Sequence, residues 1–531
     1  MAIEYDVAHV PERHPSVFEP ATFVFAVLLA VLGVIIGLEL LTRVGITPNS
    51  SIIGAVLAIA VARIPVAVVR NFTSLARQNL MQTVISGATF GGANALLLPL
   101  GVLWLVGRID LVPVMMLGAF LALVIDATIL YHVFDSKIYP ATGLWPGGVA
   151  TAECLIAGDR AGTRRNLLGV GAVVGGTGQY FGIPMDVFGV CWIGNIWALT
   201  MFGVGLLVRG YTQPLTGIDL SAHYVPHGIM IGAGLVALVQ IAIATVYKER
   251  ERAGKRGQEP EGTAPRELGP PLRWGFLAFV AAAAVMATAA GLYAEMSPGM
   301  LVAFVLFAAV AALVSELVVG IAAMHAGWFP AFATALIFLV LGMLMGFPTL
   351  PLAFLVGFTA ATGPAFADMG YDLKAGWIMR GSGRYPEYER QGRREQYLAE
   401  LLGIGVAALV VLLLYESYFA RDLFPPVDRV YAATIAAGTT PGLAVTLMLW
   451  AVPGAVVQWL GGPQRQIGIL FATGLLILNP IAGWTALIAL TVRVILLRKY
   501  GEQIQGPMYV LAGGFIAGSA LMSFGRGMVS K

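Results

Sequence analysis

Residues 299–321 read GMLVAFVLFAAVAALVSELVVGI, and Glu316 is the one ionisable side chain among them. A helix that crosses a bilayer needs about 20 predominantly apolar residues, so this stretch predicts a transmembrane helix. Similar apolar stretches recur along the chain, at 21–42, 51–69, 80–106, 112–134, 224–247, 273–295, 327–346, 398–417, 466–496 and 508–527. The sequence therefore predicts an all-α polytopic membrane protein.

The composition agrees with this class. Of the 531 residues, 58% are hydrophobic and 11% are charged, whereas about 25% of the residues of a soluble domain are charged. The net charge is +3 and no basic stripe carries interleaved aromatic residues, so no nucleic-acid partner is expected. The two cysteines, Cys154 and Cys191, lack CxxC spacing, so we expect no disulfide framework, no metal site and no cofactor.

One long hydrophilic interruption divides the chain near its middle. Residues 248–272 begin KERERAGKRGQEPEGTAPRELGPP and are rich in charge, proline and glycine, which predicts a flexible linker. We therefore expect a polar N-terminal tail at 1–20, a first transmembrane repeat at 21–247, the linker, and a second transmembrane repeat at 273–531. The positive-inside tendency places the basic linker in the cytoplasm. The polar tail lacks the basic-then-apolar order of a cleavable signal peptide.

Three segments of the first half are echoed, in the same order, in the second half. The pairs are 22–64 with 273–315, 166–174 with 400–408, and 226–235 with 512–521. In the third pair, Gly228 and Gly232 align with Gly514 and Gly518. The shared order predicts two same-direction repeats related by an axis along the membrane normal. A cytoplasmic linker requires an even number of crossings in each half, which gives about 16 transmembrane or half-spanning helices.

One segment breaks the rules for a simple spanning helix. Residues 138–158 read IYPATGLWPGGVATAECLIAG, and Pro146 suits the first turn of a new helix because its missing N–H needs no partner. We expect a helix to begin near Pro146, with Gly147 and Gly148 letting an anion or carboxylate approach the open N–H groups. Glu153 lies two turns further along in apolar surroundings, which favours a role in binding or proton transfer over a structural ion pair.

Other polar groups lie within apolar runs. Asp126 and Glu316 are deepest in their runs, and we expect them, with Glu153, to carry protons. The glycine-rich run 167–179 predicts a helix that unwinds where its backbone lines a cavity. The remaining polar groups of this kind are Glu39, Gln82, Asn94, Gln179, Asp186, Asn195, Asp368, Asp372, Lys374 and Glu400.

Four stretches resemble segments of the oligopeptide transporter (OPT) superfamily, which includes the yellow-stripe-like branch. NLMQTVISGATFGGANALLLPLGVL (79–103) is similar to a span with Gln-Thr and small residues. YPATGLWPGGVATAECL (139–155) is similar to a motif that runs from an aromatic-Pro pair to Ala-Glu. DMGYDLKAGWIMRGSGR (368–384) resembles an Asp-Leu-Lys segment, and YVLAGGFIAGSALM (509–522) resembles the last span.

The resemblance implies a proton-coupled symporter of small peptides or of metal chelates with peptide-like ligands. By position, it implies that substrate is bound around Gln82, Thr83, Pro146 and Gly147 and at Asp372 and Lys374, and that Glu153 takes part. Trp145 and Gly148, which flank Pro146-Gly147, are expected in the same binding region. Gly147-Gly148 departs from the Ser/Thr-Gly usual at this place, and no Asn-Pro-Gly signature of the peptide branch occurs. The choice between peptide and metal chelate therefore stays open.

The remaining classes of membrane protein fit less well. No GxxxxGK[ST] loop occurs, which argues against transport driven directly by ATP, and no HExxH helix indicates a membrane-embedded enzyme. A passive channel predicts filter loops in symmetric positions, and the second half has only a degenerate counterpart of Trp145-Pro146. We therefore expect a secondary active transporter, most simply a proton-coupled symporter of oligopeptides in a bacterial cytoplasmic membrane, with siderophore-like metal chelates as the alternative cargo.

Overall fold

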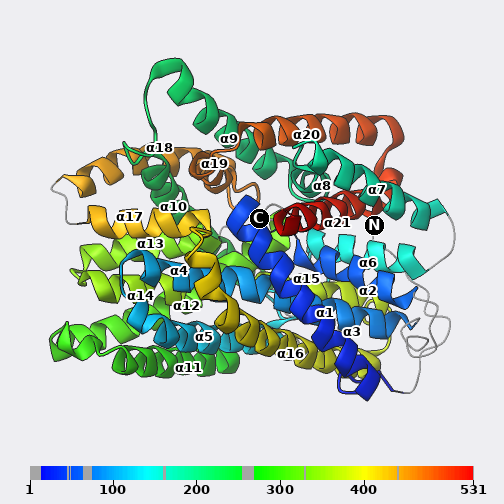
Figure 1. Ribbon diagram of the computed structural model, residues 1–531, viewed down its shortest axis with the longest axis horizontal. Helices are drawn as coiled ribbons and strands as arrows, with labels where there is room; N and C mark the ends of the chain where they lie inside the picture. The colour runs from blue at the N-terminus through cyan, green and yellow to red at the C-terminus, as the bar shows by residue number, and fades with distance from the viewer. Residues whose placement is uncertain are drawn as a thin grey trace.

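The structure, a computed structural model, describes residues 13–44, 47, 49–63, 74–159, 163–253, 268–327, 331–438 and 442–529. Residues 1–12 of the predicted tail and 254–267 of the predicted linker lie outside these ranges. The described chain forms a bundle of helices (Figure 1). The helices are Pro20–Glu39 (α1), Ser50–Ala62 (α2), Leu75–Phe90 (α3), Leu98–Leu105 (α4), Val112–Val133 (α5), Pro146–Asp159 (α6), Thr163–Tyr180 (α7), Met185–Ile193 (α8), Ile196–Thr216 (α9), Val225–Ala253 (α10), Gly269–Ala289 (α11), Pro298–Ala326 (α12), Ala331–Leu344 (α13), Thr349–Ala360 (α14), Pro364–Met379 (α15), Pro386–Phe419 (α16), Pro426–Ala437 (α17), Leu443–Gly461 (α18), Ile467–Leu476 (α19), Pro480–Tyr500 (α20) and Gln505–Val529 (α21).

Nine helical stretches within the described ranges are long and apolar enough to cross a bilayer, and five apolar helices are shorter. The chain is therefore an integral, multi-pass membrane protein. Residues 350–379 are all buried, which places α14 and α15 at the centre of the bundle. The predicted total of about 16 helices and the two repeats are not confirmed by this inventory.

Residues with strong local preferences set the helix starts. At α12, the Ser297 hydroxyl accepts the N–H of Met300 at 3.3 Å, and Pro298 occupies the first turn. At α20, the Asn479 side chain accepts the N–H of Ala482 at 3.0 Å ahead of Pro480. This second cap corrects the expectation of one continuous span over 466–496, because the chain leaves the helix after Leu476 and starts again at Pro480.

Two close helix pairs join the halves of the chain. Figure 1 shows α7 beside α21 at one end of the molecule and α10 beside α18 at the other. On α10, added Cβ atoms at Gly228 and Gly232 would meet the backbone of α18, and on α21 those at Gly514 and Gly518 would meet the backbone of α7. The glycines therefore allow two helix backbones to touch.

The glycine run 167–179 is part of one of these pairs. α7 is a continuous helix from Thr163 to Tyr180, so the expectation that this run unwinds is wrong. Added Cβ atoms on Gly171 and Gly175 would meet backbone atoms of α21 at residues 511 and 515. The run serves helix packing, which stabilises the helical state of its glycines.

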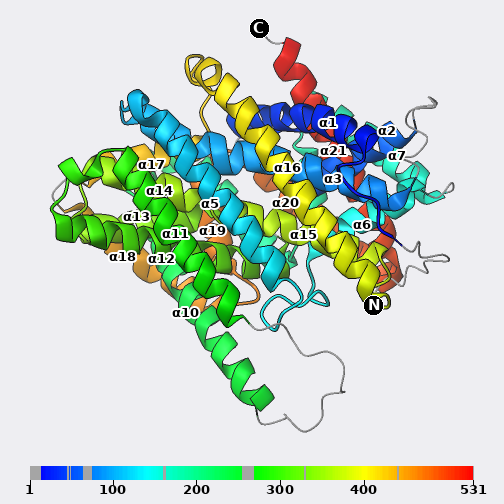
Figure 2. The same ribbon diagram turned by 90° about the horizontal axis from the view of Figure 1, so that it is seen from below.

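The long helix α16 packs against the central helix α15 and against the helices around it. It passes between α1 and α5 in Figure 2 and also packs along α3. Its first turns reach beyond the apolar part, where Arg380 at the end of α15 pairs with Glu389 at 2.7 Å and Glu389 pairs with Arg393 at 3.3 Å. The centre of the bundle is therefore held in place by α3 and α16.

Candidate functional site

The chain between α5 and α6 re-enters the bundle as an irregular segment. At its end, Trp145 has a left-handed backbone (φ 39°) and donates its N–H to the carbonyl oxygen of Met324 at 2.9 Å. The indole is fully buried, and its N–H donates to the carbonyl oxygen of Pro140 at 3.1 Å. Trp145 thus fixes the segment against α12, and α6 begins at Pro146, as the sequence predicts.

The two glycines after Pro146 pack against α15. A Cβ on Gly147 would meet the side chains of Asn49 and Tyr371, and a Cβ on Gly148 would meet the backbone of Tyr371 and the side chain of Lys374. The expectation of an open cradle is therefore corrected, since in this structure both glycines bring α6 close to α15. Direct contact of these positions with a substrate stays a prediction.

Lys374 holds the irregular segment from the other side. Its ammonium group donates to the carbonyl oxygens of Ala141 at 2.7 Å and Gly143 at 3.0 Å and lies 4.6 Å from the centre of the Trp377 ring. The charge is therefore used by backbone carbonyls that have no helical partner. In this arrangement Lys374 positions the start of α6.

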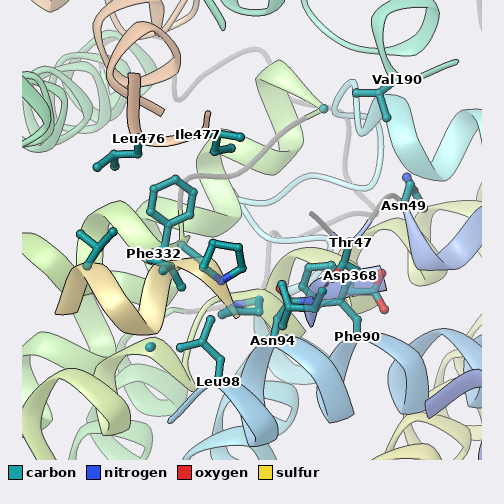
Figure 3. A pocket seen from close by; sticks show the side chains of 18 of the residues that line it. Thr47, Asn49, Phe90, Asn94, Leu98, Val190, Phe332, Asp368, Leu476 and Ile477 are labelled. Carbon is teal, nitrogen blue, oxygen red and sulfur yellow. Dashed lines mark hydrogen bonds between the residues drawn. The ribbon is translucent and has the colours of Figure 1, made fainter. Parts of the chain in front are cut away.

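A central cavity of about 140 Å³ lies next to α15 (Figure 3). The chain before α2, the π-helical turn Gly91–Leu97 between α3 and α4, the α12–α13 junction, α17 and α19 complete its wall. The polar lining residues include Thr47, Asn49 and Asn94, and the one charged side chain among the described lining residues is Asp368. Figure 3 shows Asp368 beside Thr47, on the side of the cavity opposite Phe332 and Leu476.

Three serines surround the carboxylate of Asp368. The Ser50 hydroxyl donates to Oδ1 and the Ser86 hydroxyl donates to Oδ2 at 2.7 Å, while Ser51 lies 3.4 Å from Oδ1. Ser50 and Ser51 begin α2 and Ser86 is on α3, so three elements meet at this carboxylate. The side chain is 2% exposed. Hydroxyl donors of this kind stabilise the negative charge.

Two more carboxyl groups lie behind Asp368. Asp372, one turn along α15, accepts the side-chain N–H of Gln82 at 2.5 Å through Oδ1, and Oδ2 has no hydrogen-bond partner in the described part of the chain. Glu400 of α16 packs on Gly87 of α3, and neither of its oxygens has such a partner. Asp372 and Glu400 are both fully buried or nearly so.

No described cation neutralises this group, defined here as the carboxylate cluster Asp368, Asp372 and Glu400. Lys374 is bound to the carbonyl groups before α6, and Arg380 is bound to Glu389 and to the side-chain oxygen of Gln396 at 2.8 Å. Burying an unpaired carboxylate is strongly unfavourable. Within the described part of the chain, the cluster therefore lacks a compensating positive charge.

A second acidic site lies at the N-terminus of α15. Asp126 of α5 accepts the N–H of Phe366 at 2.8 Å and that of Gly363 at 3.2 Å, so it caps α15 from another helix. Glu316 of α12 lies within hydrogen-bonding reach of Asp126, and no other donor in the described chain reaches its oxygens. Two buried carboxyl groups in contact share a proton more favourably than they carry two charges.

Glu153 occupies a different place. It is buried midway along α6, and Arg164 of α7 donates to it at 3.2 Å from a side chain that is half exposed. An added Cβ on Gly506, just inside α21, would lie 3.1 Å from Glu153. The structure therefore places Glu153 in an ion pair where α6, α7 and α21 meet, away from the carboxylate cluster, and its proton-coupling role stays a prediction.

The structure brings several predicted site residues together. Gln82 binds Asp372, Thr83 accepts the side-chain N–H of Gln396 at 3.2 Å, and Trp145 contacts Tyr371 on α15. Asp126 and Glu316 lie next to each other, although nothing in the sequence predicts that they pair. Asp368 and Glu400 stand out in the sequence only as polar groups in apolar runs, and the serines of α2 and α3 give no signal there.

The comparisons with known proteins agree with this architecture. The family model described as OPT oligopeptide transporter protein matches residues 20–249 and 187–526, which together cover nearly the whole chain. The searches of curated proteins and of solved structures found no match.

Proposed function

The chain belongs to the OPT oligopeptide transporter family, and from this premise we propose that it is a secondary active transporter that imports small oligopeptides together with protons across the cytoplasmic membrane. Membership implies membrane transport of oligopeptide-like substrates. The observation that carries the proton coupling is the carboxylate cluster, which opens onto the central cavity at Asp368 and has no described cation.

In this proposal the substrate occupies the central cavity and protons occupy the carboxyl groups behind it. Asp372 and Glu400 are buried next to a ligand site, where a proton cancels a charge that otherwise opposes burial. The pair Asp126–Glu316 shares a second proton at the start of α15, the helix that also carries Asp368 and Asp372. Protonation at either place therefore acts on the same helix.

We also propose the two same-direction repeats. The pairing of α7 with α21 is matched by that of α10 with α18, and contacts of α8 with α20 are matched by contacts of α9 with α19. Leu144-Trp145-Pro146 at the start of α6 has a counterpart in Leu423-Phe424-Pro425 just before α17. These reciprocal pairings support a twofold relation between 146–253 and 426–529, in which α7 corresponds to α18 and α10 to α21. The echo of 166–174 in 400–408, which pairs α7 with α16, does not fit this relation. Substrates of repeat-built transporters bind between the repeats.

Uptake of labelled trialanine into proteoliposomes tests the coupling. We expect the wild type to accumulate the peptide only with an inward proton gradient, and Glu400→Gln to keep peptide exchange but lose accumulation. Glu416→Gln is a matched control, because Glu416 is exposed near the other end of α16. Accumulation by the wild type that survives collapse of the gradient would contradict proton symport.

A further inference from the structure

The charge of the central cavity restricts its ligand. Among the described residues that line it, no lysine, arginine or histidine occurs, and Asp368 supplies the one charge. A ligand with net negative charge meets no cation there, and it is repelled by Asp368. A ligand with one positive group finds a partner.

Asp368 is oriented to bind a cationic group of the ligand. The hydroxyl groups of Ser50 and Ser86 each donate to one of its oxygens, so they fix the orientation of the carboxylate and offset part of the cost of burying its charge. A carboxylate accepts up to about four hydrogen bonds, and the contacts with Ser50, Ser51 and Ser86 leave it able to accept another from the cavity side.

The charged group of the cavity lies toward one side. Figure 3 shows Asp368 there with Thr47 and Asn49, beside Phe90 and Val190, and shows only the apolar Phe332, Leu476 and Ile477 toward the other side. A ligand that fits this division carries a cationic group at one end and an apolar body at the other. A small peptide with a free N-terminus and apolar side chains has this distribution.

We propose that Asp368 binds the protonated α-amino group of the peptide, and that the cavity thereby selects peptides with a free N-terminus over N-blocked peptides and anionic metal chelates. This inference rests on the proposed peptide-transport function. It adds the group that the site recognises, and it separates the two cargo classes that the sequence leaves open.

Equilibrium binding to the purified full chain in detergent, without any gradient, tests the inference. The probes are trialanine, trialanine amide, N-acetyl-trialanine and ferric citrate, each competing with labelled trialanine. A charge-assisted hydrogen bond in a buried site corresponds to a factor of about ten or more in affinity. We therefore expect N-acetyl-trialanine to bind at least about tenfold more weakly than trialanine, trialanine amide to bind as well as trialanine, and ferric citrate not to compete.

Two variants assign the effect to Asp368. Asp368→Asn should weaken the binding of trialanine and leave the binding of N-acetyl-trialanine unchanged, so that the ratio of the two affinities falls toward one. Asp368→Glu should restore part of this ratio. If Asp368→Asn does not fold, the comparison of the probes on the wild type still tests whether the site recognises a free amino group, because this comparison needs no substitution.

The outcomes separate this inference from the proposed function. Equal binding of trialanine and N-acetyl-trialanine to the wild type, or competition by ferric citrate alone, overturns the recognition of the amino group even if gradient-driven uptake is found. Selective binding of trialanine without accumulation in proteoliposomes supports the recognition and rejects symport. Binding of none of the probes overturns both.

Discussion

Asp126 combines a structural contact with a proposed proton site, and substitutions can separate the two. Asp126→Ala removes the acceptor for the N–H groups of Gly363 and Phe366. We expect a loss of about 2 kcal/mol in the free energy of unfolding, the upper range for a lost helix cap, and a lower melting temperature in detergent. Asp126→Asn keeps a carbonyl acceptor, so it should lose less stability while removing the proton site.

Glu316 provides the control for this series. Apart from Asp126, no donor in the described chain reaches its carboxyl oxygens, and a glutamine amide can still donate to Asp126, so Glu316→Gln should leave the melting temperature unchanged or raise it. An Asp126→Ala protein as stable as the wild type would show that the cap contributes little.

His14 makes the docking of the N-terminal segment depend on pH. The backbone N–H of His14 donates to the side-chain oxygen of Gln391 at 3.1 Å, and its imidazole ring contacts the ring of Tyr388; both partners are on α16. Burial, and then the charge of Arg380, lower the pKa of His14 from 6.5 to about 3. Between pH 6.5 and about pH 3, His14 binds a proton when the N-terminal segment is released from α16 but not when it is docked. Docking is therefore fully stable above about pH 6.5 and weakens as the pH falls.

Hydrogen exchange measures this effect. The amide of Val17 donates to Glu395 in the docked state, at 3.0 Å. We expect its protection, corrected for the intrinsic rate, to fall by about 1.4 kcal/mol per pH unit below pH 6.5. His14→Gln removes the titration, and protection that falls equally in this variant between pH 6.5 and 5 would exclude His14 as the cause.

At the scale of single residues, the sequence predicts which ionisable groups are buried in the membrane region better than it predicts the residues that bind them. Asp126, Glu316 and Asp372 are visible because a carboxyl group is costly in an apolar run. The serines around Asp368 are not visible, because serine is common in membrane helices and its role depends on residues far away in the chain. Glu153 was selected by the same rule as Asp126, and its neighbour Arg164 lies on the next helix.

At the scale of helices, the structural role of a glycine depends on which helix packs against it. The echo between 226–235 and 512–521 aligned Gly232 with Gly518, and both now lie where a Cβ would meet a carbonyl oxygen of the facing helix, at Ala451 and Ala172 respectively. The sequence showed that the two positions correspond. It does not show which helix each glycine faces, and the prediction that the run in α7 unwinds fails for the same reason.

Gly232→Ala and Gly518→Ala test these contacts. Each methyl group forces two helices apart, and we expect a loss of about 1–3 kcal/mol in the free energy of unfolding. Gly525→Ala, on the same helix as Gly518, adds a methyl group to open space and should be neutral or stabilising by up to about 1 kcal/mol. Thermal unfolding in detergent compares the three variants, and equal melting temperatures would contradict close packing at the first two.

At the scale of the molecule, the cavity is a property of the whole fold, since its wall joins segments from Leu41 to Ile477. Ala331→Trp fills it, and we expect the folded variant to lose trialanine binding by at least about tenfold. The control Ala278→Trp fills the groove between α5 and α11, where Trp274 is exposed, and should bind trialanine like the wild type. Unchanged binding by Ala331→Trp would place the substrate elsewhere.

Composition and apolar runs suffice to predict the membrane class, because the bilayer requires long apolar helices. They did not reveal the span at Thr349–Met379, whose Gly363-Pro364 break and buried polar groups lower its mean hydropathy. Nor do they predict which helices pair, since α7, α9, α10, α18 and α21 all present small residues.

The pairing of α7 with α21 has a consequence for biosynthesis. α7 ends at Tyr180, and the helix that covers its glycine face begins at Gln505. At about 5–20 residues per second, a ribosome takes roughly 15–65 s to make the intervening chain. During this time α7 lies in the membrane without its partner, so the insertion machinery or a lipid must shield a surface shaped for another helix, and nascent chains truncated before residue 505 should be preferred targets of membrane quality-control proteases.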